Sequence, residues 1–264
     1  MTQKEKIIFG HKPDWEKDIR ACVGADYDIV VGGEGWCARN DWQSFDLIVP
    51  LTIRDGWMLR KAGIRLAGKA LCPSAQAVAF CHDKHGFSSA LSLTRFHATI
   101  PRLIDKADGL MFPCILKQKM DEYGTNSLIL HGEADAVTWS RRIGSPGYFL
   151  QEYISGSEER ATHLLLRNGR IVHAYTVAYD MGEQPFVKGQ WCQHRSMTGS
   201  HDERFLDVFA DILRIAGFTD GTCCFDYKVV DGIPKIFEVN PRFGWSLLYD
   251  LGNYLRAYGI AARA

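Results

Sequence analysis

The stretch 223-CCFDYKVVDGIPKIFEVNPRFGWS-246 is the most informative part of this sequence. It consists of two hydrophobic runs joined by Asp231-Gly232, which is typical of a β-hairpin. Asp226 lies on the first run, and Glu238 and Asn240 project from one face of the second because they are two residues apart. Two carboxylates and an amide oxygen suit a hard cation such as Mg²⁺. The stretch therefore predicts a cation site of the kind that bridges to nucleotide phosphates, with an ordinary surface hairpin bearing scattered acids as the alternative.

The register of this hairpin is a stringent test of the cation site. A two-residue turn at Asp231-Gly232 would place Asp226 opposite Phe237 and would turn Glu238 to the other face. We therefore predict a three-residue loop from Asp231 to Ile233, with Gly232 at positive φ, because an odd loop brings Asp226 opposite Glu238. A plain two-residue turn would weaken the cation interpretation.

Composition indicates a soluble globular protein. The 264 residues carry 31 basic and 31 acidic side chains, and no basic stripe recurs, so nucleic acid is an unexpected partner. No apolar run reaches the roughly 20 residues that span a bilayer, and the first ten residues lack a signal-peptide pattern. The eight cysteines include no CxxC pair, which favours reduced thiols, a cytoplasmic protein and no zinc site.

The chain changes character along its length. Residues 1–75 hold short apolar runs alternating with helical patterns, which predicts a parallel βαβ sheet. From about residue 150 the pattern becomes antiparallel, with Asn168-Gly169 as a strong hairpin signal. Ser74 is a good N-cap for a helix to about His82, residues 202–217 show a clear helical period, and the tail from Ser246 is expected to be helical. The expected fold class combines α/β and α+β parts.

Four segments in order resemble the ATP-grasp superfamily of ATP-dependent ligases: 82-HDKHGF-87, 112-FPCILKQKMDEYGTNS-127, 149-FLQEYISGSEE-159 and 225-FDYKVVDGIPKIFEVNPRFG-244. They span residues 74–246, about two thirds of the chain, and the Asn-Pro-Arg ending is nearest to the carbamoyl-phosphate-synthase and biotin-carboxylase branch. The resemblance implies two α+β subdomains that sandwich ATP, preceded by a small βαβ domain.

The implied boundaries are residues 1–75 for the N-terminal domain and 76–264 for the ATP-grasp domain. Within the latter, about 100–148 would form a central lid subdomain and 149–264 an antiparallel subdomain with the Mg²⁺-binding hairpin.

The resemblance also implies the nucleotide contacts. Two lysines, Lys84 and Lys117, would bind the phosphates, and the glycine-poor loop 120–127, which contains Gly124, would close over them. The hinge strand would hold adenine through the backbone of Glu152 and Ile154, with Gln151 where the family often has an acid. Glu158 would bind the ribose hydroxyls, with Glu159 as a substitute.

The same resemblance makes Asp226, Glu238 and Asn240 the ligands of Mg²⁺, or of Mn²⁺ in its place. Arg242 would direct its guanidinium into the pocket toward a phosphoryl or carboxylate oxygen, for which its planar fork is suited. Arg195 would be a further ligand of the γ-phosphate. With Lys117, these two arginines form the expected catalytic set.

The implied function is that of a ligase. ATP would activate a small-molecule carboxylate as an acylphosphate, and an amine, by default an amino acid or other small molecule, would attack it. Two alternatives stay open, a kinase that stops at phosphoryl transfer and a nucleotide-binding module without catalysis. A homodimer would follow the family's habit, and the sequence names neither the acid nor the amine.

Overall fold

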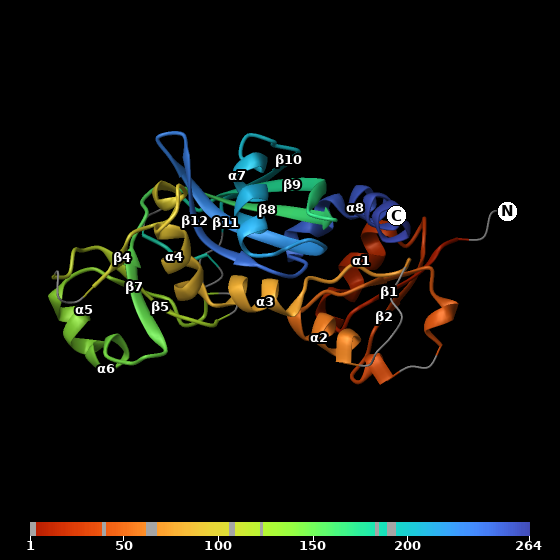
Figure 1. The fold of residues 1–264 in the computed structure, drawn as a ribbon, viewed down its shortest axis with the longest axis horizontal. Coiled ribbons are helices and arrows are strands. Elements are labelled where there is room, and N and C mark those ends of the chain that lie inside the picture. The colour runs from red at the N-terminus through yellow and green to blue at the C-terminus, as the bar shows by residue number, and fades with distance from the viewer. Residues whose placement is uncertain are drawn as a thin grey trace.

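Three β-sheets follow one another along the length of the molecule (Figure 1). The computed structural model describes residues 4–38, 41–61, 68–105, 109–121, 124–182, 185–188 and 194–264. A three-stranded sheet lies at one end, a four-stranded sheet at the other, and a five-stranded sheet between them. Within these ranges, no helix is long and apolar enough to cross a membrane.

The N-terminal sheet is parallel, as the sequence predicts. Its order is β2-β1-β3, formed by β2 (Asp28–Val31), β1 (Lys6–Phe9) and β3 (Leu47–Val49). Helix α1 (Glu16–Val23) packs against one face and α2 (Ile53–Lys61) against the other, so the central strands are buried on both sides. This burial explains why β1 and β3 are short, continuous apolar runs without alternation.

The four-stranded sheet is antiparallel and has the order β4-β7-β5-β6. Its strands are β4 (Leu103–Ile104), β5 (Cys114–Gln118), β6 (Leu128–Leu130) and β7 (Tyr148–Glu152), with the short helices α5 (Glu133–Thr138) and α6 (Ser140–Ile143) beside them. Strand β7 pairs with β5 through Lys117 and Phe149. The subdomain boundary predicted at residue 148 therefore falls inside this sheet, and the hinge strand belongs to the smaller sheet.

The five-stranded sheet is the antiparallel part expected after residue 150, with the order β10-β9-β8-β11-β12. Its strands are β8 (Glu158–Arg167), β9 (Arg170–Asp180), β10 (Ser196–Ser200), β11 (Gly221–Val230) and β12 (Ile233–Asn240). Asn168 and Gly169 form the tight β8–β9 turn at φ of 51° and 74°, which confirms the predicted hairpin.

Helices cover this sheet unequally on its two faces. On one face lie α3 (Ala75–His82), α4 (Lys84–Ser92) and α7 (Leu206–Ile215), which share an apolar core with β8, β11 and β12. Ser74 caps α3 by accepting a hydrogen bond from the Ala77 amide, as predicted. On the other face, η6 (Trp245–Asp250) and α8 (Leu251–Arg263) cover only the end next to the N-terminal sheet, which confirms a helical tail.

The closing hairpin reaches the predicted pairing by a different route. Its turn has only two residues, Asp231 and Gly232, at φ of 51° and 77°, so the predicted three-residue loop is wrong. Asp226 nevertheless pairs with Glu238, because the register shifts at a β-bulge where Phe237 is the extra residue. A bulge and an odd loop change the parity of a hairpin equally, so the sequence alone left the choice open.

Candidate functional site

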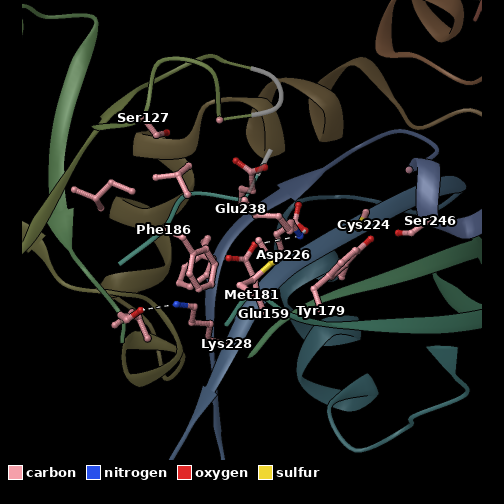
Figure 2. Close-up of a pocket in the computed structure, with 18 of the residues that line it drawn as sticks. Ser127, Glu159, Tyr179, Met181, Phe186, Cys224, Asp226, Lys228, Glu238 and Ser246 are labelled. Atoms are coloured by element: carbon pink, nitrogen blue, oxygen red, sulfur yellow. Dashed lines mark hydrogen bonds and ion pairs between the residues drawn. The ribbon is translucent and has the colours of Figure 1, made fainter. Parts of the chain in front are cut away.

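A cavity of about 400 Å³ lies between the four-stranded and five-stranded sheets. Its walls come from β5 and β7 on one side, from β8, β9, β11 and β12 on the other, and from the connection between β9 and β10. The residues along β11 give its direction, because Lys228, Asp226 and Cys224 are two apart and all line the cavity. Figure 2 shows Asp226 and Glu238 near its middle, Lys228 and Phe186 on one side, and Tyr179 and Ser246 on the other.

The predicted cation ligands meet in the middle of this cavity. Asp226 and Glu238 face one another across the β11–β12 pair, and the Asn240 amide nitrogen donates to both carboxylates, at 2.9 Å and 2.8 Å. All the potential donor atoms to a metal here are oxygens, which fits a hard divalent cation. For the Asn240 oxygen to join them, its amide would have to turn over. Among the described residues, no group of three or more His, Cys, Asp and Glu is placed to hold a metal.

Lys84 neutralises one of these carboxylates. It is the first residue of α4, whose N-cap Asp83 accepts a hydrogen bond from the Gly86 amide. The Lys84 side chain is 4% exposed, and its ammonium lies 2.7 Å from the Glu238 carboxylate. Although burial works in the opposite direction, the ammonium groups of Lys84 and Lys117 lower the pKa of Glu238 to about 2. Glu238 is therefore ionised at neutral pH.

Lys117 reaches the same place from the opposite sheet. Its ammonium donates to the carbonyl of Phe237 at 3.1 Å and to the side-chain oxygen of Gln151 at 3.3 Å. The bulge thus turns a backbone carbonyl toward this lysine as well as setting the register. Burial lowers the pKa of Lys117 to about 8, with Lys84 acting in the same direction and Glu238 against it.

A third lysine, Lys188, was not predicted from the sequence. It comes from the β9–β10 connection and forms ion pairs with Asp226 and, at 3.1 Å, with Glu159. Although burial works against its charge, these two carboxylates raise the pKa of Lys188 well above its usual range. No motif surrounds it in the sequence, so its role is visible only in the folded chain.

The hinge strand forms one end of the cavity, lined by Gln151, Glu152 and Ile154. The Glu152 amide donates a hydrogen bond to the backbone carbonyl of Arg102, and the Ile154 carbonyl accepts one of 3.0 Å from the Lys228 ammonium. Lys228 is 2% exposed and lies 4.2 Å from the centre of the Phe186 ring, and burial lowers its pKa to about 8. Lys228 was not predicted as a cavity residue, although its two-residue spacing from Asp226 on one strand places both side chains on the same face.

The structure places the acid of the β8 strand differently from the prediction. Glu158 is half exposed, pairs with Arg160 at 2.7 Å, and is not among the described residues that line the cavity. Its neighbour Glu159 is 6% exposed, lines the cavity and pairs with Lys188. Burial raises the pKa of Glu159, with Lys188 opposing the shift. Glu159 therefore replaces Glu158 as the acid available to a ligand.

Of the two predicted arginines, only Arg242 is among the described residues that line the cavity. Arg242 lines the cavity and donates to the Phe243 carbonyl at 3.1 Å. Arg195 is exposed, and its guanidinium lies against Gly182, outside the described lining of the cavity. His194 takes the position beside the cavity, edge-on to Tyr179 with ring centres 5.6 Å apart.

Gly124 of the predicted lid loop lies next to the segment that carries Lys188. Its φ is 64°, and an added Cβ would come within 3.1 Å of Val187 and 3.3 Å of the Lys188 carbonyl. A side chain at Gly124 would therefore be strained and crowded. Within the expected lid, residues 122–123 lie outside the described residues, and Ser127 lines the cavity.

Known proteins share this architecture, although no family model and no curated relative matches the sequence. D-alanine–D-alanine ligase from Bacillus anthracis, solved with ATP, matches with a TM-score of 0.63 and 14% identity over 99% of this chain and 97% of its own. Phosphoribosylamine–glycine ligase from Thermotoga maritima matches with a TM-score of 0.68 and 13% identity over 96% and 75%. The chain has the ATP-grasp fold.

Other ATP-grasp proteins cover the chain equally well. Biotin carboxylase from Campylobacter jejuni, solved with an ATP analogue, matches with a TM-score of 0.63 and 13% identity over 99% of this chain and 71% of its own. The fold prediction is thereby confirmed. All three structures share only 13–14% identity with this chain, so the predicted branch stays a prediction.

Proposed function

We propose that this protein is an ATP-dependent ligase that joins a small-molecule carboxylate to an amine. The observation that carries the proposal is the convergence of Lys84, Lys117, Asp226, Glu238 and Asn240 in one cavity between two sheets of an ATP-grasp fold. Lys117 reaches the hairpin from the four-stranded sheet, whereas Lys84 begins helix α4, which packs on the five-stranded sheet that contains the hairpin.

In this proposal ATP lies along the cavity with its base at the hinge. The Glu152 carbonyl and the Ile154 amide would contact the adenine edge, since the other backbone groups of these residues already bond to Arg102 and Lys228. Glu159 would bind the ribose hydroxyls in place of Glu158. Lys117 and Lys84 would contact the phosphates, a task for which mobile ammonium groups are well suited.

Asp226, Glu238 and Asn240 would hold Mg²⁺, or Mn²⁺, between the protein and the phosphates. When bound, such an ion neutralises charge that develops on the transferred phosphoryl group. The charges of the site fit this role, because Lys84 and Lys188 already supply positive charge to the two carboxylates. The ammonium groups would be free to turn toward phosphate oxygens once a divalent ion compensates the acids.

The proposed reaction has two steps. An oxygen of the substrate carboxylate attacks the γ-phosphorus, the bond to ADP breaks, and an acylphosphate forms. The amine nitrogen then attacks the acyl carbon and loses a proton, and phosphate leaves with the C–O bond electrons. Arg242 would orient the carboxylate through its planar fork. The expected lid loop 120–127, which contains Gly124, would exclude water from the acylphosphate.

An ADP-release screen of carboxylic acids crossed with amino acids tests the proposal, with mass spectrometry of each hit. The ligase predicts ADP, phosphate and an amide in equal amounts. A phosphorylated product without an amide would indicate the kinase, and nucleotide binding without turnover the non-catalytic module. Glu238→Gln should lower turnover on the order of 10²-fold or more, whereas the exposed Glu133→Gln should leave it unchanged. Intact turnover in Glu238→Gln would contradict the proposal.

A further inference from the structure

The cavity continues past the two carboxylates, away from the hinge. Along β11, Lys228 bonds to the hinge, Asp226 lies in the middle, and Cys224 marks the far end. His163 pairs with Cys224 across the sheet and lines the same end. Figure 2 shows Tyr179, Cys224 and Ser246 together on this side of Asp226. We call this end, with Trp15, Arg242 and Trp245 added to its walls, the distal subsite.

The polar side chains deep in the distal subsite bond to one another. His163 Nε2 lies 2.7 Å from the Ser246 hydroxyl. Burial, with Arg242 and Lys188 acting in the same direction, lowers the pKa of His163 to about 3, so its ring is neutral. His163 and Ser246 therefore present an uncharged surface to a ligand.

Among the described residues, the walls of the distal subsite carry an arginine and no acid. Arg242 lies on its wall, and Lys188 lies at its border with the metal carboxylates. The acids among the described lining residues are Glu152, Glu159, Asp226 and Glu238, all at the hinge or in the middle of the cavity. The described part of this end therefore offers a cation for a carboxylate and no carboxylate for an ammonium group.

Aromatic rings form the walls of the distal subsite. Trp15 reaches it from the N-terminal sheet layer and packs on Phe243, with ring centres 6.2 Å apart. Trp245 enters from η6, is 39% exposed, and meets Tyr249 edge-on at 5.4 Å. Flat, partly exposed rings of this kind recognise other flat or apolar groups by stacking.

We propose that the distal subsite binds the carboxylic acid substrate, and that this acid carries an aromatic group and no α-ammonium group. The inference rests on the proposed ligase function for its reaction. The carboxylate would point toward Arg242 and the γ-phosphate, and the aromatic body would lie against Trp245 and Tyr179. A small amino acid would then be the amine partner rather than the activated acid.

Matched acids test this assignment. Phenylacetate, cyclohexylacetate, succinate and phenylalanine are compared for ADP release with ATP, with hydroxylamine as the amine so that any acylphosphate is trapped as a hydroxamate. We expect kcat/KM for phenylacetate to exceed that for each of the other three by about tenfold or more. Preference for succinate or phenylalanine would overturn the inference while leaving the ligase function intact.

Binding measured separately distinguishes the two proposals. Calorimetric titration of phenylacetate in the presence of a non-hydrolysable ATP analogue should show binding that Trp245→Ala weakens about tenfold. Trp57→Ala, a control at a tryptophan 53% exposed on α2, should leave it unchanged. Binding that depends on Trp245 without ADP release would support the subsite and contradict the ligase. Absence of phenylacetate binding, or equal binding by wild type and Trp245→Ala, would overturn the subsite.

Discussion

Lys188 occupies the place of a cation beside the predicted metal ligands. Its ammonium pairs with Asp226 and Glu159. A divalent ion that enters without nucleotide must displace this ammonium. Lys188→Met keeps much of the side-chain volume and removes the charge. We therefore predict that this variant binds free Mn²⁺ more tightly than the wild type does.

The expected size follows from the ion pairs. At an effective dielectric constant of about 20, charges 3.1 Å apart, the Lys188–Glu159 separation, attract by about 5 kcal/mol before desolvation is counted. Charged hydrogen bonds retain a net value of about 1.5–3 kcal/mol in proteins. Removing the competing ammonium should therefore tighten Mn²⁺ binding about tenfold to a hundredfold.

The effect should reverse when nucleotide is present. A divalent ion then compensates the acids, and the released ammonium can neutralise phosphate, so Lys188→Met should weaken binding of the Mn²⁺ nucleotide complex. Free Mn²⁺ measured by electron paramagnetic resonance, with and without ADP, reports both quantities. Lys235→Met is the control, because that ammonium bonds to Ala98 outside the cavity. Unchanged Mn²⁺ affinity in Lys188→Met, or the same change in Lys235→Met, would show that the Lys188 ammonium does not compete with the metal ion.

Two further predictions concern stability. An added Cβ on Gly244 would collide with the His163 ring, so Gly244→Ala should lower the free energy of unfolding by about 1–3 kcal/mol. Gly252→Ala is its control, because the nearest atom to its Cβ is 3.9 Å away, and equal effects in urea denaturation would contradict the account. Burial lowers the pKa of Lys228 from 10.5 to about 8, so the unfolded chain holds a proton that the folded protein has lost between these pH values. Stability should rise by up to about 3 kcal/mol across that window relative to Lys228→Met, and parallel pH profiles would count against it.

Much of the fold could be predicted from the sequence because the patterns that mark its turns and strands are local. Asn168-Gly169 and the parallel strand runs predicted their elements directly, and the pairing of Asp226 with Glu238 was also foreseen. The β-bulge at Phe237 that produces this pairing was not predicted, because a bulge has no distinct sequence pattern within an apolar run.

The errors in the site have a similar cause. Glu158 and Glu159 differ only in which face of β8 they occupy, and that strand has buried residues on both faces, so alternation could not decide between them. Lys188 lies between β9 and β10, outside any regular helix or strand, so no sequence period predicts its position.

The proposed ligase activates its acid by phosphorylation on the carboxylate. The direct measurement is isotope transfer from an acid found by the screen, labelled with ¹⁸O at both carboxylate oxygens. Mass spectrometry of the released phosphate should find one ¹⁸O in each molecule, because the acid's oxygen stays with phosphorus when the amine attacks the acyl carbon. Unlabelled phosphate, or label recovered in AMP, would contradict the account.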